Sequence, residues 1–329
     1  MQKNVKKLSF IFIFILTLTS FTLSTTADSE TVYVIPSGEA VGVKIYTQGL
    51  LVVGMSQKTC SNKIKVNDRI EYANGTALIS NEQFADIVNK NPDKITVTVD
   101  RKGEKITFDL KTYKDEDGMN RLGLWLRDST AGIGTVTYFN PKNNTFAALG
   151  HGIADIDTGN ILTVKSGNIL PCHILSVTKG ENGNPGELNG SFDGSSIGKI
   201  MLNTENGIFG KYSYSVSAEP IPVASVSEIK EGYATILANV DGGSVKEYTA
   251  EIIKINPSGK SAKNMVIKIT DRSLLAITGG IVQGMSGAPI IQNGKLVGAV
   301  THVFVNDSSK GYGVFAENMI NVSENIDYS

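Results

Sequence analysis

The sequence predicts a mainly β protein with two domains. Short apolar stretches recur along the chain and are separated by glycine and asparagine. Glycine is abundant, at 34 of 329 residues, while aromatic residues make up only 7%. Regularly spaced short strands with frequent turn residues are typical of sandwiches and closed barrels. The charged, turn-forming segment 114–118 separates a small N-terminal region from a larger one.

Composition excludes several classes of ligand. The formal net charge is −1 with acidic and basic residues interleaved, so no basic face for nucleic acid is expected. The two cysteines, Cys60 and Cys172, fall in different predicted domains, and we expect both to be unpaired. His151, His173 and His302 are dispersed without metal-ligand spacing. We therefore expect no metal and no cofactor.

The N-terminal residues 1–27 resemble an export signal. Lys3, Lys6 and Lys7 precede an almost continuous apolar run at 8–18, and serines and threonines follow up to Ala27. A positive segment followed by a short apolar one is the architecture of a signal peptide. An uncleaved single-pass anchor is the alternative. In both cases we expect the rest of the chain outside the cytoplasmic membrane.

Residues 31–112 are expected to form a small αβ domain. A helix is predicted from about Glu82 to Asn89, capped by Asn81, with Phe84, Ile87 and Val88 on one face. The turn residues Asn74 and Gly75 precede it. The predicted strands are 31–35, 41–45, 49–54, 64–70, 95–99 and 105–110.

Residues 118–325 are expected to form the second, all-β domain. One short helical turn is predicted at 226–230. The predicted strands are 122–126, 133–139, 145–149, 161–164, 174–177, 199–202, 207–212, 234–238, 246–255 and 265–269. The pattern alone does not separate one large sandwich from two barrels.

A candidate nucleophile lies in the turn 283–289, where Ser286 follows Gly284-Met285 and precedes Gly287. Glycine on both sides allows backbone conformations closed to other residues, and it lets a substrate carbonyl approach closely. The N–H groups of Gly284 and Ser286 are candidates for an oxyanion hole. The alternative is a hairpin turn with a small residue at its tip.

His151 is the candidate general base, because it follows a short apolar run and stands between two glycines. Asp271 lies between His151 and Ser286 in sequence, which gives the order His, Asp, Ser. Asp155 and Asp157 follow the histidine closely, and either of them is an alternative partner for its ring. A Ser–His dyad without a third member also remains open.

These segments carry a resemblance to known families. The serine turn resembles that of chymotrypsin-like peptidases, although Met285 replaces an aspartate that pairs with a new N-terminus after activation. The set 127–134, 149–151, 283–289 and 299–307 resembles the stage IV sporulation protein B peptidases. Residues 31–112 resemble a PDZ domain of the bacterial peptidase type, with Asn67 in place of the usual glycine.

The resemblance implies an N-terminal PDZ-like αβ sandwich followed by a double β-barrel with the active site between the barrels. It favours Asp271 as the third catalytic residue, and it implies that Thr301, His302 and Val303 contact the substrate. It also implies an exported serine endopeptidase of the forespore intermembrane space. This enzyme would cleave itself and a membrane regulator, in signalling that activates a sigma factor.

The resemblance to a PDZ domain also implies that this domain binds a peptide. The competing functions are a non-catalytic envelope scaffold that binds through this domain and a general quality-control protease of the envelope. Quality-control proteases of this kind carry the PDZ domain after the protease domain, whereas here it comes first.

Overall fold

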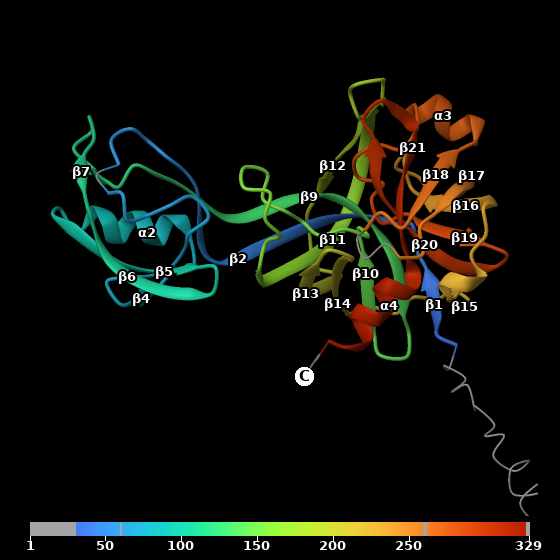
Figure 1. The fold of residues 1–329 in the computed structure, drawn as a ribbon, viewed down its shortest axis with the longest axis horizontal. Helices are drawn as coiled ribbons and strands as arrows, with labels where there is room; N and C mark the ends of the chain where they lie inside the picture. The colour runs from blue at the N-terminus through green and yellow to red at the C-terminus, as the bar shows by residue number, and fades with distance from the viewer. Residues whose placement is uncertain (1–30, 60, 259–261, 327–329) are drawn as a thin grey trace, which may run out of the picture. The chain divides into compact units, whose positions relative to one another are not determined.

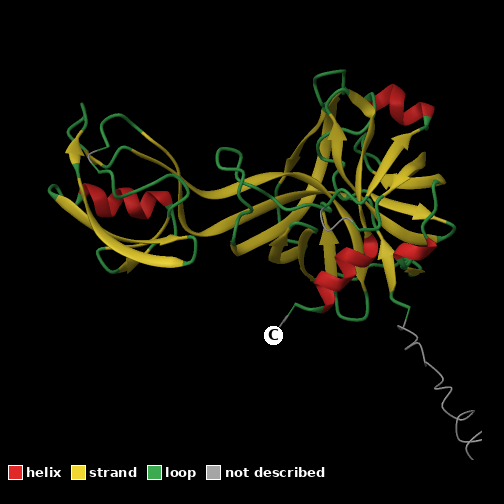
Figure 2. Cartoon of the chain, viewed as in Figure 1, coloured by secondary structure: helices red, strands yellow, loops and turns green. Residues whose placement is uncertain are grey.

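The computed structural model describes residues 31–59, 61–258 and 262–326, most of which lie in strands (Figures 1 and 2). The expected export segment 1–27 and Cys60 lie outside these residues. Cys172 is a half-buried free thiol. Within the described ranges, no helix is long and apolar enough to cross a membrane. The mainly β class predicted from the sequence is confirmed.

The first barrel is closed by six antiparallel strands in the order β2, β9, β10, β14, β13 and β11, with β11 pairing back to β2. Side chains alternate between the two faces of each strand, and Phe146, Ile200 and Ile208 are among those buried inside. Three further strands, β1, β12 and β15, pair at the margins. The bounds are β1 Tyr33–Pro36, β2 Ala40–Met55, β9 Leu124–Asn140, β10 Thr145–Ala148, β11 Val164–Thr178, β12 Glu187–Phe192, β13 Gly198–Thr204, β14 Gly207–Tyr212 and β15 Ile221–Pro222.

The second barrel is closed by six strands in the order β16, β17, β18, β21, β20 and β19. Its core includes Ile236, Ile252, Ile267 and Ile290, all fully buried. The expected helical turn before it is present as a 3₁₀ turn, Val226–Glu228. The bounds are β16 Gly232–Ala238, β17 Lys246–Ile255, β18 Met265–Ile269, α3 Arg272–Thr278, β19 Pro289–Gln292, β20 Lys295–Phe304, β21 Asp307–Phe315 and α4 Ala316–Glu324.

The PDZ-like lobe is built from the far ends of β2 and β9 together with the segments between them. Helix α2 packs Phe84 and Val88, one turn apart, into the lobe's core. Its N-cap is Ser80 rather than the expected Asn81, because the Ser80 hydroxyl accepts from the N–H of Gln83 at 3.2 Å. The bounds are β3 Arg69–Ala73, β4 Thr76–Ala77, α2 Asn81–Asn89, β5 Lys94–Arg101, β6 Glu104–Lys111, β7 Tyr113–Lys114 and β8 Asn120–Arg121.

The structure divides the chain differently from the expected domains 31–112 and 118–325. Strand β1 and residues 40–46 of β2 pair with β9 and β11 and belong to the first barrel. The lobe is therefore an insertion between two barrel strands. Alternation of apolar and polar residues revealed the strand at 41–45 but not the sheet it joins.

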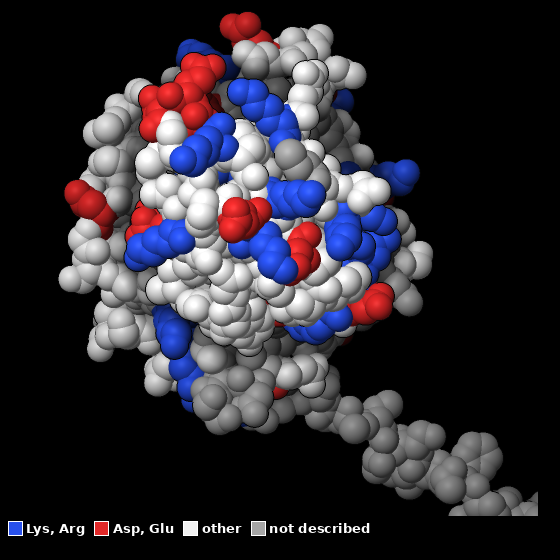
Figure 3. Space-filling view, turned by 90° about the vertical axis from the view of Figure 1, so that its left-hand side faces the viewer, with Lys and Arg blue, Asp and Glu red and all other residues white. Residues whose placement is uncertain are grey.

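The charged segment at 114–118 is not a linker between domains. It forms the turn of a small hairpin between β7 and β8, in which Arg121 Nε lies 2.7 Å from Asp115 Oδ2. On the face drawn in Figure 3, basic side chains lie next to acidic ones instead of forming a single block.

Candidate active site

The serine turn lies directly on the first barrel. Gly284 and Gly287 have φ of +98° and +99°, which side chains with a Cβ rarely adopt. A Cβ on Gly287 would lie 2.0 Å from the Thr135 carbonyl oxygen and 2.5 Å from the Leu149 nitrogen. Only glycine allows the turn to approach β9 and the end of β10 this closely. Since β10 leads to His151, this contact brings the two candidate residues near each other.

Hydrogen bonds from β9 fix the backbone of the turn. Thr135 donates its N–H to the Ser286 carbonyl at 2.9 Å and its hydroxyl to the Gly284 carbonyl at 2.7 Å. The Thr137 hydroxyl donates to the Gly287 carbonyl at 2.8 Å. Both threonines are buried, so these bonds are shielded from water. The first barrel therefore holds the turn of the second barrel in place.

His151 follows an unusual backbone turn. Leu149 and Gly150 have φ of +69° and +66°, and the first of these is strained for a leucine. The Nδ1 atom of His151 lies 2.9 Å from the Gly152 carbonyl oxygen. Because a carbonyl only accepts, Nδ1 carries the proton and Nε2 presents its lone pair. Burial lowers the pKa of His151 below its ordinary value, so the ring is neutral at pH 7.

His151 and Ser286 line the same cleft, which has a volume of about 420 Å³ and receives residues from both barrels. Among the described residues, no Asp, Glu, Lys or Arg lines it, and much of its wall is aliphatic. The Ser286 hydroxyl donates to the Thr301 carbonyl oxygen at 2.6 Å. The His302 ring lies beside the His151 ring, with 4.6 Å between centroids.

The segment Thr301–Val303, expected to contact substrate, lines this cleft. The pairing of β20 with β21 shifts register between Val300 and Val303, so the strand bends where it borders the cleft. The His302 side chain is partly open to solvent at the mouth of the cleft. Partial desolvation of its ring, together with the nearby His151 and Lys263, lowers the pKa of His302 to about 4.

Two backbone N–H groups are available for an oxyanion. In the described part of the chain, the N–H groups of Gly284 and Ser286 have no acceptor, and both residues line the cleft. Their neighbours differ, since Met285 N–H donates to the Val282 carbonyl and Gly287 N–H to the Val300 carbonyl. The expected pair of donors is thus compatible with the geometry.

Asp271 does not occupy the position expected of a third catalytic residue. Its carboxylate caps helix α3 by accepting from the N–H groups of Ser273 and Leu274 at 2.9 and 3.0 Å, and it also accepts from Thr249 N–H at 3.4 Å. A hydrogen bond from the Ser273 hydroxyl, together with these backbone bonds, holds the pKa of Asp271 below its ordinary value. Asp271 is not among the residues that line the cleft.

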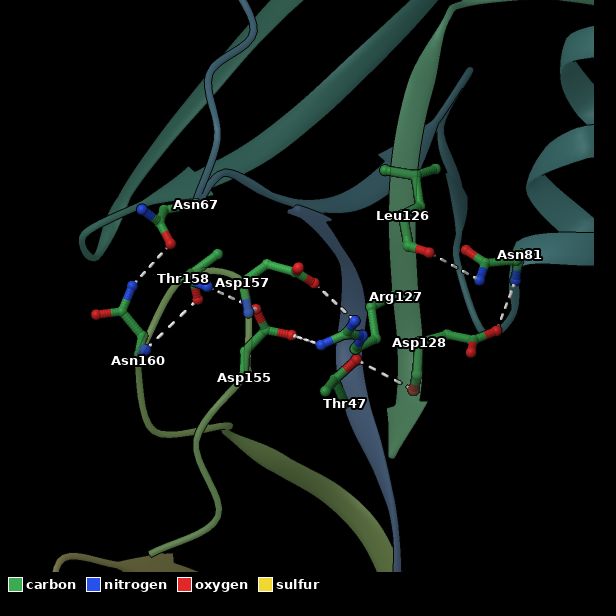
Figure 4. Close-up of polar contacts among 10 residues, drawn as sticks. All are labelled: Thr47, Asn67, Asn81, Leu126, Arg127, Asp128, Asp155, Asp157, Thr158 and Asn160. Carbon is green, nitrogen blue, oxygen red and sulfur yellow. Dashed lines mark hydrogen bonds and ion pairs between the residues drawn. The ribbon is translucent and has the colours of Figure 1, made fainter. Parts of the chain in front are cut away.

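The alternative carboxylates, Asp155 and Asp157, are also engaged elsewhere. Both form ion pairs with Arg127, on β9 (Figure 4). The group that meets His151 Nδ1 is instead the Gly152 carbonyl. In the described part of the chain, His151 and Ser286 therefore line one cleft, with the Gly152 carbonyl beside the His151 ring.

Sequence reasoning missed several residues that build this site. In the sequence, Thr135 and Thr137 look like ordinary strand positions. Asn203 carries no local signal, because its amide bonds to the backbone of Ile153 and Leu162, which are distant in sequence. Asp271, in contrast, did carry a signal in the sequence for its role as a helix cap. It precedes a short apolar helix that ends at Gly279-Gly280, a typical pattern of N-cap and C-terminal glycine.

Comparisons with known proteins agree with a peptidase. The profile of the family described as SpoIVB peptidase S55 matches residues 118–320, which is well over half of the chain. No curated protein matches the chain significantly.

Three solved structures show low overall similarity. Two are forms of Rv3671c from Mycobacterium tuberculosis. The active form of this protease is 16% identical, with a TM-score of 0.33 over 59% of this chain and 73% of its own. An inactive form is 14% identical, with a TM-score of 0.32 over 58% and 78%.

The third is the PDZ domain of an SdrC-like protein from Listeria monocytogenes, which is 19% identical with a TM-score of 0.23 over 24% of this chain and 87% of its own. Because the family model matches residues 118–320, the chain belongs to the SpoIVB peptidase family, S55, and is a serine peptidase.

Proposed function

We propose that Ser286 is the nucleophile of this peptidase and His151 its general base. The observation that carries the proposal is that a glycine-flanked serine turn from one barrel and a neutral histidine from the other line one cleft. Nucleophilic serine needs an adjacent base with a free lone pair, and Nε2 of His151 supplies it.

The reaction begins when the Ser286 hydroxyl turns from the Thr301 carbonyl toward His151. Oγ forms a bond to the substrate carbonyl carbon while its proton moves to Nε2. The resulting oxyanion is held by the N–H groups of Gly284 and Ser286, each worth about 3 kcal/mol. The C–N bond then breaks as the imidazolium protonates the leaving amine, and water repeats the sequence to release the acid.

The substrate is proposed to be an extended protein segment that lies along Thr301–Val303. The described residues that line the cleft include no acidic or basic side chain other than histidine, so this lining suits uncharged residues at the scissile bond.

A second binding function is proposed for the PDZ-like lobe. A cavity of about 520 Å³ lies between helix α2 and the segment Leu122–Leu126, lined by Phe84, Ala85 and Val88 on the helix side. A groove between a helix and a strand is where an added peptide strand pairs. The lobe would hold a substrate or the chain's own segment for cleavage.

The biological role we propose follows the family. The chain would be exported through its N-terminal segment into the forespore intermembrane space, secreted or anchored there. It would cleave a membrane-bound sporulation regulator, and itself, in signalling that activates a sigma factor. The competing roles remain a non-catalytic envelope scaffold and a general quality-control protease.

The test is incubation of the full-length chain, wild type and Ser286→Ala, followed by mass spectrometry. We expect cleavage fragments and fluorophosphonate labelling at Ser286 in the wild type only, with both proteins folded. Cleavage by the variant at the wild-type rate would refute the assignment. A folded wild type that neither cleaves nor reacts with the probe would favour the scaffold.

A further inference from the structure

Arg127 links the strand leaving the PDZ-like lobe to the loop that follows His151 (Figure 4). Its guanidinium forms an ion pair with Asp155, whose side chain is fully buried, and a second at 2.7 Å with Asp157. Asp155 Oδ1 also accepts from the N–H groups of Asp157 and Thr158 at 3.1 and 2.9 Å. The carboxylate of Asp155 therefore organises the loop around itself.

A second set of hydrogen bonds lies at the base of this loop, between Asp155 and His151. The Asn203 amide accepts from Ile153 N–H at 2.8 Å and donates to the carbonyls of Ile153 and Leu162 at 2.8 and 2.9 Å. Ile153 directly follows Gly152, whose carbonyl meets His151 Nδ1. Asn203 thus holds the base of the loop Ile153–Leu162, and Arg127 holds it through Asp155 and Asp157. Near its far end, Asn160 Nδ2 donates to Asn67 Oδ1 of the lobe at 2.7 Å (Figure 4).

Loss of the Arg127 guanidinium would leave a buried carboxylate without its counter-charge. Such a group moves toward water or takes up a proton, because an unpaired charge is unstable in the interior. Asp155 lies only four residues after His151, so its movement would displace the Gly152 carbonyl that orients the ring.

We infer that Arg127 is a positioning residue for the peptidase reaction and that, through Asp155, it holds the loop that orients His151. The inference rests on the proposed roles of Ser286 and His151. Asp155 acts on the histidine through the backbone of Gly152 and not through a direct contact of its own carboxylate.

The chain supplies a matched control for the test. Arg101 pairs with Asp68 inside the lobe, with side-chain exposures of 24% and 1%, and the pair of Arg127 with Asp155 has 27% and 0%. Neither Arg101 nor Asp68 lines the cleft. Arg101→Gln therefore breaks a pair of the same type and burial at a distance from His151.

The experiment uses the full-length chain in mild detergent, as wild type, Arg127→Gln, Arg127→Lys and Arg101→Gln. The rate of Ser286 acylation is measured over a range of fluorophosphonate concentrations, which separates half-saturation from maximal rate. Labelling with ¹⁵N-histidine reports the tautomer of each ring. The chain has only three histidines, so His173→Gln and His302→Gln complete the assignment.

We expect Arg127→Gln to lower the maximal rate about 100-fold, as small misplacements of a catalytic group do, with little change in half-saturation. The His151 spectrum should lose its Nδ1–H pattern. Arg127→Lys keeps a cation at Asp155 and should recover most of the rate, while Arg101→Gln should match the wild type in both readings.

A folded Arg127→Gln protein with wild-type rate and tautomer would overturn the inference, and so would an equal loss in Arg101→Gln. If Arg127→Gln does not fold, the double variant Arg127→Gln/Asp155→Asn removes the unpaired charge. Its maximal acylation rate and its His151 tautomer are then measured in the same way. A wild type that does not react at Ser286 would refute the proposed function itself, which separates the two failures.

Discussion

Gly287→Ala tests whether contact between the barrels holds the serine turn. Gly287 has φ of +99°, and an added methyl would lie 2.0 Å from the Thr135 carbonyl oxygen and 3.0 Å from Leu149 Cα. The left-handed backbone costs about 1–2 kcal/mol for a residue with a Cβ. Overpacking adds about 1–3 kcal/mol, because both neighbours are backbone atoms. We therefore expect a loss of about 2–5 kcal/mol in the free energy of unfolding.

Gly294→Ala is the matched control, since Gly294 has φ of +73° and nothing within 4 Å of an added Cβ. It should lose only about 1–2 kcal/mol. Urea unfolding followed by circular dichroism measures both losses, and fluorophosphonate labelling measures Ser286 reactivity. We expect reactivity to fall at least about tenfold in Gly287→Ala, because the turn shifts away from His151, and to be unchanged in Gly294→Ala. Equal losses in the two variants would show that the contact with β9 and β10 does not position the serine.

Three further predictions follow from the site and the lobe. Because burial lowers the pKa of His151, Ser286 acylation should stay constant down to about pH 6.5 and decline only below it. An acylation rate that already falls at pH 7.5 would contradict this expectation. The folded state should also lose stability below about pH 6.5, since the unfolded chain binds the proton more readily. Asp271→Ser keeps a capping oxygen, so it should retain Ser286 reactivity, whereas Asp271→Ala should lose about 1 kcal/mol of stability in urea. Inactive but stable Asp271→Ser would restore a catalytic role for this carboxylate. Ala85→Trp should fill the lobe's groove and abolish the binding of library peptides, measured by fluorescence polarisation. Asp86→Trp, on the same helix but outside the groove, should leave this binding unchanged. Unchanged binding in Ala85→Trp would place the peptide elsewhere.

Local patterns in the sequence were sufficient to predict strands, turns and the mainly β class. They did not reveal which sheet a strand joins. Val41, Val43 and Ile45 alternate as a strand should, but their partners on β11 lie more than 120 residues away. Their assignment to the small domain followed from sequence proximity alone, and it was wrong for that reason.

The candidate site was predictable to a similar extent. Glycines around Ser286 and His151 marked both as unusual turns, and the structure places both in one cleft. The chain order of His, Asp and Ser gave no information about where the Asp271 carboxylate points, because helix capping competes for the same oxygens. The contribution of Gly152 could not be predicted, since a backbone carbonyl leaves no mark in the sequence.

Strands β2 and β9 amount to one long β-hairpin whose loop is a folded domain. Tyr46 pairs with Ser129, and the connection between them, residues 47–128, is 82 residues long. Compared with a four-residue turn, closing such a connection as a flexible chain costs about 3 kcal/mol more in entropy. The pairing of Leu51 with Arg127 inside the lobe already brings the two ends together, so a lobe that folds first removes most of this cost. Excision of the lobe should therefore be made between Thr47 and Asp128, with a tight turn in its place. Deletion of residues 31–112 would instead also remove β1 and β2, and the loss of β2 would open the first barrel.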